Sequence, residues 1–512
     1  MERCRNGTRR NKQTSDCETY PQLRRCRNGT RRNKQTGDCE PYPQNKPRCK
    51  NGTRRNTRDC EEVTVQVPKP YDWFYNLGWF RRIREIPRTN LTPRSKNAAI
   101  IQRFMKKTRH KRIAAFLNAV CNDSGVCIAF GKEIKKIKAF FGNFSFDYIK
   151  DPIKRVGAVS VNGFVNELKF THKGYSSYAI LKSSVRELSD NLMYEYRVGQ
   201  FLNKMSLRFP CFVETYKLLK YPTTNGWELV QTSKVMEASV FKKNVAPQVY
   251  SLKEGCKSSI KVAVLIQHLK DVILIEDLIH SSKAAINYEF ISTLYQIYFV
   301  LDCMKDVFTH YDLHGQNVLL YEPSKKKYIK YHYHTPTKVI IFRSIYLAKI
   351  IDYGRSYFKD GTYSSQKIYT EVCREPECNT LNSGTCGSRS GFRLLKPRDT
   401  TSYIVSSVPN KSHDLRLVYY LLRKIGNQVL SPTITGFVKE VKSNLKYDGN
   451  FGTKERTCAI PTICDVTDMK NVLERYVVNL LESEFFRYYP RRTKLGDMHV
   501  YSDGRPLEFI ES

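Results

Sequence analysis

The chain has 512 residues, of which 41% are hydrophobic and 12% aromatic, so it can bury at least one large core. Its 86 Lys and Arg residues exceed its 49 Asp and Glu residues, which leaves a formal net charge of +37. Such a charge attracts nucleic acid, anionic membrane surfaces, ATP or acidic proteins, and its sign alone does not choose among them. Met1 is followed by polar sequence and every later apolar run is short, so we expect a protein that is not secreted and has no membrane span.

Residues 1–62 contain three copies of a basic repeat with a period of about 22 residues. Each copy runs from Cys-(Arg/Lys)-Asn-Gly-Thr-Arg-Arg-Asn to a second cysteine, and the six cysteines are Cys4, Cys17, Cys26, Cys39, Cys49 and Cys60. Asn-Gly favours a hairpin turn, but the repeats have almost no apolar residues for a core. A disulfide in each copy, a zinc site, or flexible reduced segments all stay open, although two cysteines fall short of the usual four zinc ligands.

Residues 63–150 are predicted to be a linker followed by a helical extension. Apolar residues recur at helical spacing over 100–120 and 134–141, and Cys121 and Cys127 bracket a Ser-Gly turn between these stretches. Lysines lie between the apolar residues of the second stretch. We interpret them as the solvent-exposed face of an amphipathic helix.

The pattern changes over residues 151–270 to alternating and β-branched segments, which predict a small antiparallel sheet. The expected strands are 156–165, 166–170, 178–181, 211–220 and 262–268, with a helix at 191–205. Long helical patterns dominate residues 271–512, beginning with 291–307. A strand-rich part followed by a helix-rich part predicts an α+β fold with two lobes.

Residues 308–320 run from a helix through a polar turn into an apolar strand, and the turn holds His310-Tyr311-Asp312 and Asn317. Phosphoryl transfer needs phosphates positioned, magnesium held, and a hydroxyl oriented by a carboxylate. Asp312 can orient the hydroxyl as the catalytic residue. Asn317, five positions later, can turn back across the loop to ligate Mg²⁺.

Two further residues complete a candidate nucleotide site. Asp352 follows an apolar strand at a glycine turn and can bridge Mg²⁺ and the phosphates, although an Asp-x-Gly surface turn is the ordinary alternative. Lys182 ends an apolar strand and can bind the α- and β-phosphates, unless it is merely an exposed strand end. Glu195, on the predicted helix, is the expected partner of Lys182, and Glu187 is a rival.

A hairpin over 157–165 corresponds to the phosphate-binding pattern Gly-x-Gly-x-x-Gly-x-Val only with two replacements. Ala158 and Ser160 take the places of the first two glycines, while Gly163 and Val165 fit. Small residues still let the backbone approach phosphates, so these four positions are candidate ATP contacts.

With these residues in order, the segment from about 156 to the helices after Asp414 resembles the eukaryotic-type protein kinase fold. The whole chain resembles serine/threonine protein kinases of large nucleocytoplasmic DNA viruses (iridovirus-like), through Cys-Asn-Asp-Ser-Gly-Val-Cys at Cys121 and Tyr-Glu-Tyr-x-Val-Gly at Tyr194. Its repeats resemble the two-cysteine adaptor modules of those viruses.

The resemblance implies ATP and Mg²⁺ as cofactors, viral or host proteins as substrates, and the host cytoplasm or the virion as location. It also implies that Asp414 braces the catalytic loop from a buried helix. Residues 265–269 would be the hinge that holds adenine, near the backbone of Gln267 and His268.

Several positions depart from the kinase pattern. Tyr311 stands where many kinases have Arg, so activation through a phosphorylated loop is not expected. His314 replaces the usual Lys two residues after the catalytic Asp and is expected to contact the γ-phosphate with a pH-dependent charge. The basic stretch 325–334 most simply forms an inserted hairpin. In the expected activation region, 355–411, reduced thiols or one disulfide are preferred over zinc for Cys373, Cys378 and Cys386.

The sequence therefore predicts an ATP-dependent serine/threonine protein kinase. A pseudokinase scaffold is the alternative, in which the basic cysteine repeats bind viral structural proteins, or bind nucleic acid without sequence preference. His314 also leaves open a kinase that acts on a small molecule.

Overall fold

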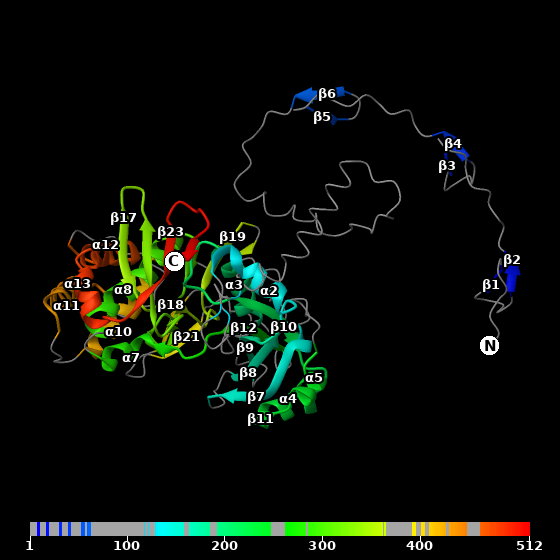
Figure 1. The fold of residues 1–512 in the computed structure, drawn as a ribbon, viewed down its shortest axis with the longest axis horizontal. Helices are drawn as coiled ribbons and strands as arrows, with labels where there is room; N and C mark the ends of the chain where they lie inside the picture. Colours follow the sequence, from blue (N-terminus) through cyan, green and yellow to red (C-terminus); the bar gives the residue numbers. More distant parts are fainter. Residues whose placement is uncertain are drawn as a thin grey trace. The chain divides into compact units, whose positions relative to one another are not determined.

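The computed structural model describes six short strands before residue 63, residues 117, 121 and 127, and residues 130–511 with gaps. The gaps are 158–162, 185–191, 247–261, 283–284, 362, 365–391, 396–400, 405–408, 426–429 and 448–460. The chain divides into two compact units, Met1–Ala99 and Ile100–Ser512 (Figure 1). This division falls inside the segment 63–150 that the sequence predicts as linker and helical extension.

The first unit contains one antiparallel hairpin in each sequence repeat. The strand pairs are β1 (Thr8–Arg10) with β2 (Cys17–Thr19), β3 (Thr30–Arg32) with β4 (Cys39–Pro41), and β5 (Thr53–Asn56) with β6 (Asp59–Glu62). Each ladder sets an arginine opposite a glutamate, at Arg9 and Glu18, Arg31 and Glu40, and Arg54 and Glu61. The cross-links considered for the repeats, and those for Cys373, Cys378 and Cys386, lie outside what the structure describes.

The second unit begins with a six-stranded antiparallel sheet in the order β10-β12-β9-β8-β7-β11. Its strands are β7 (Ile149–Val156), β8 (Gly163–His172), β9 (Tyr175–Ser184), β10 (Thr215–Lys220), β11 (Val235–Met236) and β12 (Val262–His268). Around it lie α2 (Ile134–Phe140), α3 (Leu192–Met205), α4 (Thr224–Thr232) and α5 (Ala238–Asn244) (Figure 1). Cys121 and Cys127 form a disulfide and an isolated antiparallel bridge.

The predicted strand 156–165 is wrong, because the chain turns within it. β7 ends at Val156, Gly157 has a left-handed φ of 68°, and β8 starts at Gly163. Glycine reaches this conformation without steric cost, so it ends the strand where apolar alternation alone would continue it.

Helices dominate the remainder of the second unit. They are α7 (Ile275–Ser281), α8 (Phe290–Met304), α10 (Arg416–Lys424), α11 (Pro432–Asn444), α12 (Val466–Val477) and α13 (Glu482–Tyr488). α8 is buried on almost every side, in agreement with the helix predicted over 291–307, and packs against α12 (Figure 1). The predicted α+β class is confirmed.

Short strands position the loops between these helices. β13 (Ile273–Leu274), β15 (Val318–Tyr321) and β18 (Leu347–Ile350) form one small sheet, and β14 (Phe308–Thr309), β19 (Tyr357–Asp360) and β20 (Tyr363–Ser364) form another. A further hairpin joins β21 (Phe392–Leu395) to β22 (Thr401–Ile404).

The predicted insertion 325–334 supplies only the first strand of a hairpin, whose second strand lies further on at 339–344, and this hairpin also pairs with residues 493–501. β16 (Lys327–His334) and β17 (Val339–Ser344) are antiparallel, while β23 (Thr493–Tyr501) lies parallel to β16 and pairs with β24 (Glu508–Glu511). The helix-rich part therefore carries a four-stranded sheet that the helical patterns did not indicate.

Glu289, just before α8, is a fully buried carboxyl group with neutral partners. The backbone N–H of Ile345 donates to Oε1 at 3.2 Å, and the Ser344 hydroxyl lies against Oε2. Burial raises the pKa of Glu289 to about 7, because no water solvates the charged form. This group ties the start of α8 to the turn after β17.

We expect Glu289→Gln to gain stability relative to the wild type as the pH rises. The pKa of Glu289 in the folded state lies above its ordinary value of 4.5. The wild-type side chain therefore makes its full contribution to the free energy of unfolding below pH 4.5, and this contribution is lost as the pH rises through about 7. The stability difference should move in favour of the variant by about 3 kcal/mol between pH 4.5 and 8. Urea unfolding across this range measures it, with exposed Glu228→Gln as control. Parallel profiles for the wild type and Glu289→Gln would contradict the assignment.

Across the described ranges, no helix is long and apolar enough to cross a membrane.

Candidate active site

Lys182 joins two carboxylates that come from different elements. Its Nζ lies 2.7 Å from Oε2 of Glu195 on α3 and 2.9 Å from Oδ1 of Asp352, just after β18. The Glu195 side chain is only 2% exposed, whereas Asp352 is 46% exposed. Glu187, the rival partner of Lys182, lies outside the described residues. The structure thus brings together three of the predicted site residues.

These charges set one another's protonation. Burial lowers the pKa of Lys182, but the two carboxylates outweigh burial and hold the pKa above its usual value. Lys182 in turn lowers the pKa of Asp352 to about 2. Burial raises the pKa of Glu195 against the pull of Lys182. At neutral pH, Lys182 is a cation and Asp352 an anion that can ligate a metal.

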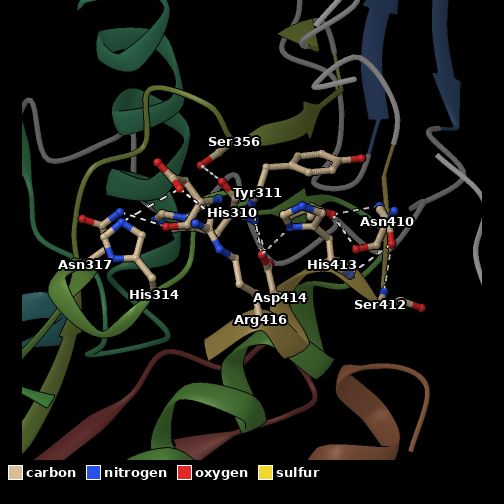
Figure 2. A network of polar contacts seen from close by, with 12 residues as sticks. His310, Tyr311, His314, Asn317, Ser356, Asn410, Ser412, His413, Asp414 and Arg416 are labelled. Atoms are coloured by element: carbon tan, nitrogen blue, oxygen red, sulfur yellow. Dashed lines mark hydrogen bonds and ion pairs between the residues drawn. The ribbon is translucent and has the colours of Figure 1, made fainter. Parts of the chain in front are cut away.

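Asp414 braces the loop that contains Asp312. It lies in a 3₁₀ turn, His413–Leu415, before α10, and is buried. Its Oδ2 accepts the backbone N–H of His310 at 2.8 Å and its Oδ1 that of Tyr311 at 3.0 Å (Figure 2). Tyr311 has a left-handed φ of 62°, a conformation that costs free energy for a residue with a side chain. The two charged hydrogen bonds hold the loop in this conformation.

His310 connects this loop to the segment before Asp352. Its Nε2 lies 2.9 Å from the Ile351 carbonyl oxygen, and its Nδ1 lies 3.3 Å from the backbone N of Asp312. An imidazole with its proton on Nε2 satisfies both contacts, since it donates to the carbonyl and accepts from the amide. The loop and the segment that precedes Asp352 are therefore held in one geometry.

Asn317 and Asp352, the two predicted metal ligands, lie on segments that are joined by a backbone hydrogen bond. The Asn317 side-chain amide donates to the Asp312 carbonyl oxygen at 2.8 Å, which leaves its Oδ1 as the possible ligand atom. The backbone N–H of Ile351 donates to the Asn317 carbonyl at 3.0 Å. Asp352 has a φ of 66°, a strained conformation of the kind found at functional sites. Among described residues no group of three or more His, Cys, Asp or Glu could hold a metal, but Mg²⁺ at phosphates often takes only one or two protein ligands.

Three basic side chains surround the Asp312 carboxylate. Arg416 Nη1 lies 2.6 Å from Oδ1, and Arg355 Nη1 lies 3.7 Å from Oδ2. His314 Nε2 is 3.9 Å from Oδ1, and its Nδ1 accepts the backbone N–H of Gln316 at 3.2 Å. Burial lowers the pKa of His314 despite the nearby Asp312, so its imidazole is largely neutral at pH 7.

The remaining predicted ATP contacts lie along the sheet. Val165 on β8 pairs with Lys182 on β9, and a side chain at Gly163 would meet the Ser183 carbonyl oxygen at 2.7 Å. Only glycine fits there, while Ala158 and Ser160 lie outside the described residues.

Gln267 and His268 lie at the end of β12. The Gln267 N–H donates to the Glu214 carbonyl oxygen at 2.8 Å, so an adenine contact by this residue would fall to its carbonyl group. The His268 imidazole lies 3.0 Å from a carboxylate oxygen of Glu167.

Arg355, Arg416 and the Tyr353 hydroxyl are functional candidates that sequence reasoning missed. Arg416 follows Asp414 by two residues, but it lies 104 positions from the carboxylate that it contacts. No local pattern carries such a contact.

No family model matches this chain, and no curated protein sequence matches it significantly.

The Tyr353 hydroxyl bridges two backbone groups beside Asp352. It donates to the Ile350 carbonyl at 2.6 Å and accepts the Val213 N–H at 3.0 Å. We expect Tyr353→Phe to destabilise the protein by about 1–3 kcal/mol, because the variant leaves the buried Val213 N–H without its partner. Thermal unfolding checks this. Tyr419→Phe is the matched control, because the Tyr419 hydroxyl accepts only an exposed hydrogen bond from Arg423 among the contacts described. An equal effect of the two substitutions would rule out the bridge.

Proposed function

We propose that the chain is an ATP- and Mg²⁺-dependent serine/threonine protein kinase with the bilobal kinase fold. The sheet of residues 151–270 would be its N-lobe, and residues 271–512 its C-lobe. The observation that carries the proposal is the convergence of Lys182 with Glu195 and Asp352 beside the braced loop of Asp312. Viral or host proteins would be its substrates, in the host cytoplasm or the virion.

The residues present suit this chemistry. Lys182 is a cation suited to the α- and β-phosphates, and Asn317 and Asp352 offer two oxygen ligands for Mg²⁺. In the reaction, the acceptor oxygen forms a bond to the γ-phosphorus, and the bond from that phosphorus to the β,γ-bridging oxygen breaks. ADP leaves, and the hydroxyl proton passes to the Asp312 carboxylate and then to solvent.

Transfer of labelled phosphate from ATP to acidic and basic test proteins would examine this proposal. Asp312→Asn should lower incorporation by on the order of 10²-fold or more, since the carboxylate that orients the hydroxyl is lost. Asp306→Asn is the control, because its side chain is 72% exposed. Equal incorporation by the wild type and Asp312→Asn would refute the proposal.

A pseudokinase scaffold is the second candidate, and the 2.6 Å ion pair between Arg416 and Asp312 favours it, since the carboxylate is already engaged. Such a scaffold could bind nucleic acid or viral structural proteins through the three N-terminal hairpins. Thermal stabilisation by Mg-ATP without label transfer would support it. Nucleic-acid binding through the basic repeats should weaken steeply with salt, and a salt-insensitive complex would exclude the electrostatic mode.

A further inference from the structure

Three histidines lie together on one face of the four-stranded sheet formed by β17, β16, β23 and β24. His332 and His334 come from β16, and His499 comes from β23, where it pairs with His332. The rings of His332 and His499 stack with centroids 4.4 Å apart, and those of His334 and Tyr501 at 4.5 Å. His334 Nε2 lies 3.0 Å from His499 Nδ1, and these two residues are called the histidine pair below. A stack of rings therefore runs along the boundary between the parallel strands β16 and β23.

The facing nitrogens of the histidine pair can share only one proton. One ring donates its N–H, and the other accepts it with a lone pair. A first added proton can bind the outer nitrogen of the donor ring, and the hydrogen bond is then kept. A second added proton would set N–H against N–H and one imidazolium against another at 3.0 Å. This closed arrangement is therefore incompatible with two protonated rings.

The carboxylates that face the histidine pair already have other partners. These contacts join Asp497 to His332 (2.9 Å) and Lys494 (2.7 Å), Asp503 to Arg505 (2.8 Å), and Glu508 to Tyr501 (3.2 Å). On the other side of β16, the ladder places the apolar residues Val339 and Ile341 opposite His334 and His332.

Burial is the main cause that lowers the pKa of both members of the histidine pair below 6.5. The nearby His332 lowers both values further, as does Arg505 for His334. The three carboxylates act in the opposite direction but do not outweigh burial. The surroundings therefore disfavour proton uptake while the rings are packed together.

The β23–β24 hairpin joins β16 to the chain that follows α3. At the end of β23, the Ser502 N–H donates to the His334 carbonyl oxygen at 3.0 Å. The Leu507 N–H donates to the carbonyl oxygen of Leu207, two residues after α3 ends, at 3.0 Å, and the Leu507 side chain is buried. Separation of β23 from β16 would therefore act on a contact beside the helix that carries Glu195.

We propose that the histidine pair is an acid-sensitive contact that holds the β23–β24 hairpin on β16 and releases it when both rings are protonated. Above pH 6.5 the shared hydrogen bond and the stacked rings stabilise the closed hairpin. Below pH 6.5, the ordinary pKa of histidine, the open hairpin binds two protons where the closed one holds at most one. Because the folded-state pKa values are lowered, the closed hairpin loses stability as the pH falls. This contact acts on the fold, so it goes beyond phosphoryl transfer and does not depend on it.

Hydrogen exchange on the full chain tests the proposed contact. Between pH 7.5 and 5.5, the protection factors of the Ser502 and Leu507 amides should fall about tenfold or more, while those of amides in α8 change less than about threefold. The reason is that a proton bound only by the open hairpin favours opening about tenfold at one pH unit below the ordinary pKa.

A double variant, His334→Gln with His499→Asn, removes both titrating rings but keeps polar atoms near the positions of Nε2 and Nδ1. The protection of Ser502 and Leu507 in this variant should change less than about threefold over the same pH range. His280→Gln, at an exposed position on α7, is the matched control and should keep the full loss seen in the wild type. Equal losses in the wild type and the double variant, or a wild type that keeps its protection down to pH 5.5, would overturn the proposal.

A titration of the wild type decides the question if the double variant does not fold, which thermal melts at pH 7.5 would reveal. NMR of histidine-labelled protein follows each ring of the histidine pair. At least one of the two rings should titrate below pH 6.5 while the hairpin is closed. If both rings become protonated at or above pH 6.5 without loss of Ser502 protection, the pair does not control the hairpin.

Discussion

Lys182→Met is expected to destabilise the protein without nucleotide by about 3–5 kcal/mol at pH 7, and by much less at pH 4.5. The substitution removes the cation 2.7 Å from Glu195, whose side chain is 2% exposed. A carboxylate that is buried without a cation either lowers the stability of the fold by the free energy of its desolvation or takes up a proton. Asp352 is less affected, because its 46% exposure lets water solvate its charge.

The pH dependence follows from Glu195. In the variant its folded-state pKa rises further above the ordinary value of 4.5, since burial already raises it in the wild type. Below pH 4.5 the carboxyl is protonated in both the folded and the unfolded chain, so no penalty arises. As the pH rises, the unfolded chain gains stability by ionising and the variant loses stability relative to the wild type.

Urea unfolding at pH 4.5 and pH 7 measures this prediction. Lys204→Met is the matched control, because its ion pair with Asp360 is largely exposed on the lysine side and should contribute at most about 1 kcal/mol. The double variant Lys182→Met, Glu195→Gln should recover much of the loss at pH 7. A destabilisation that does not change with pH would show that Lys182 acts through packing instead.

The contact of Lys182 with Glu195 and the presence of Asp352 in the same site could be predicted from sequence, because each residue is marked locally. An apolar strand ends at the lysine, a helical pattern contains Glu195, and a strand with a glycine turn delivers Asp352. The predicted partner Glu195 lies 2.7 Å from Lys182, whereas the 2.9 Å contact of Lys182 with Asp352 was not predicted. The tie from Asp414 to the loop before Asp312 was expected only from the kinase resemblance, and the structure contains it as two backbone hydrogen bonds.

Contacts without a local pattern could not be predicted. Arg416 and Arg355 reach Asp312 from α10 and from the turn after Asp352, and their spacing in the chain indicates no such pairing. The parallel pairing of β16 with β23 joins residues about 167 positions apart, such as His332 and His499. A strand pattern shows that a strand forms, but its partner is chosen by packing of the whole fold.

Asp414→Ala is expected to cost about 3–5 kcal/mol and to remove any activity that depends on Asp312. The carboxylate accepts two buried backbone N–H groups, from His310 and Tyr311, and Ala supplies no acceptor for either. Each charged hydrogen bond contributes roughly 1.5–3 kcal/mol. Without them, the left-handed conformation of Tyr311 loses two hydrogen bonds that stabilise it, so the chain before Asp312 should relax.

Hydrogen exchange and urea unfolding separate the local effect from the global one. The amides of His310 and Tyr311 should lose protection in Asp414→Ala under conditions where α8 stays protected. Asp465→Ala is the matched control, since Asp465 also accepts a backbone N–H, at the start of α12, but is only half-buried and should cost about 1 kcal/mol. If the two variants lose equal stability, the buried brace contributes no more than an ordinary helix cap, and the fixed geometry of the Asp312 loop must come from His310 and its contact with Ile351.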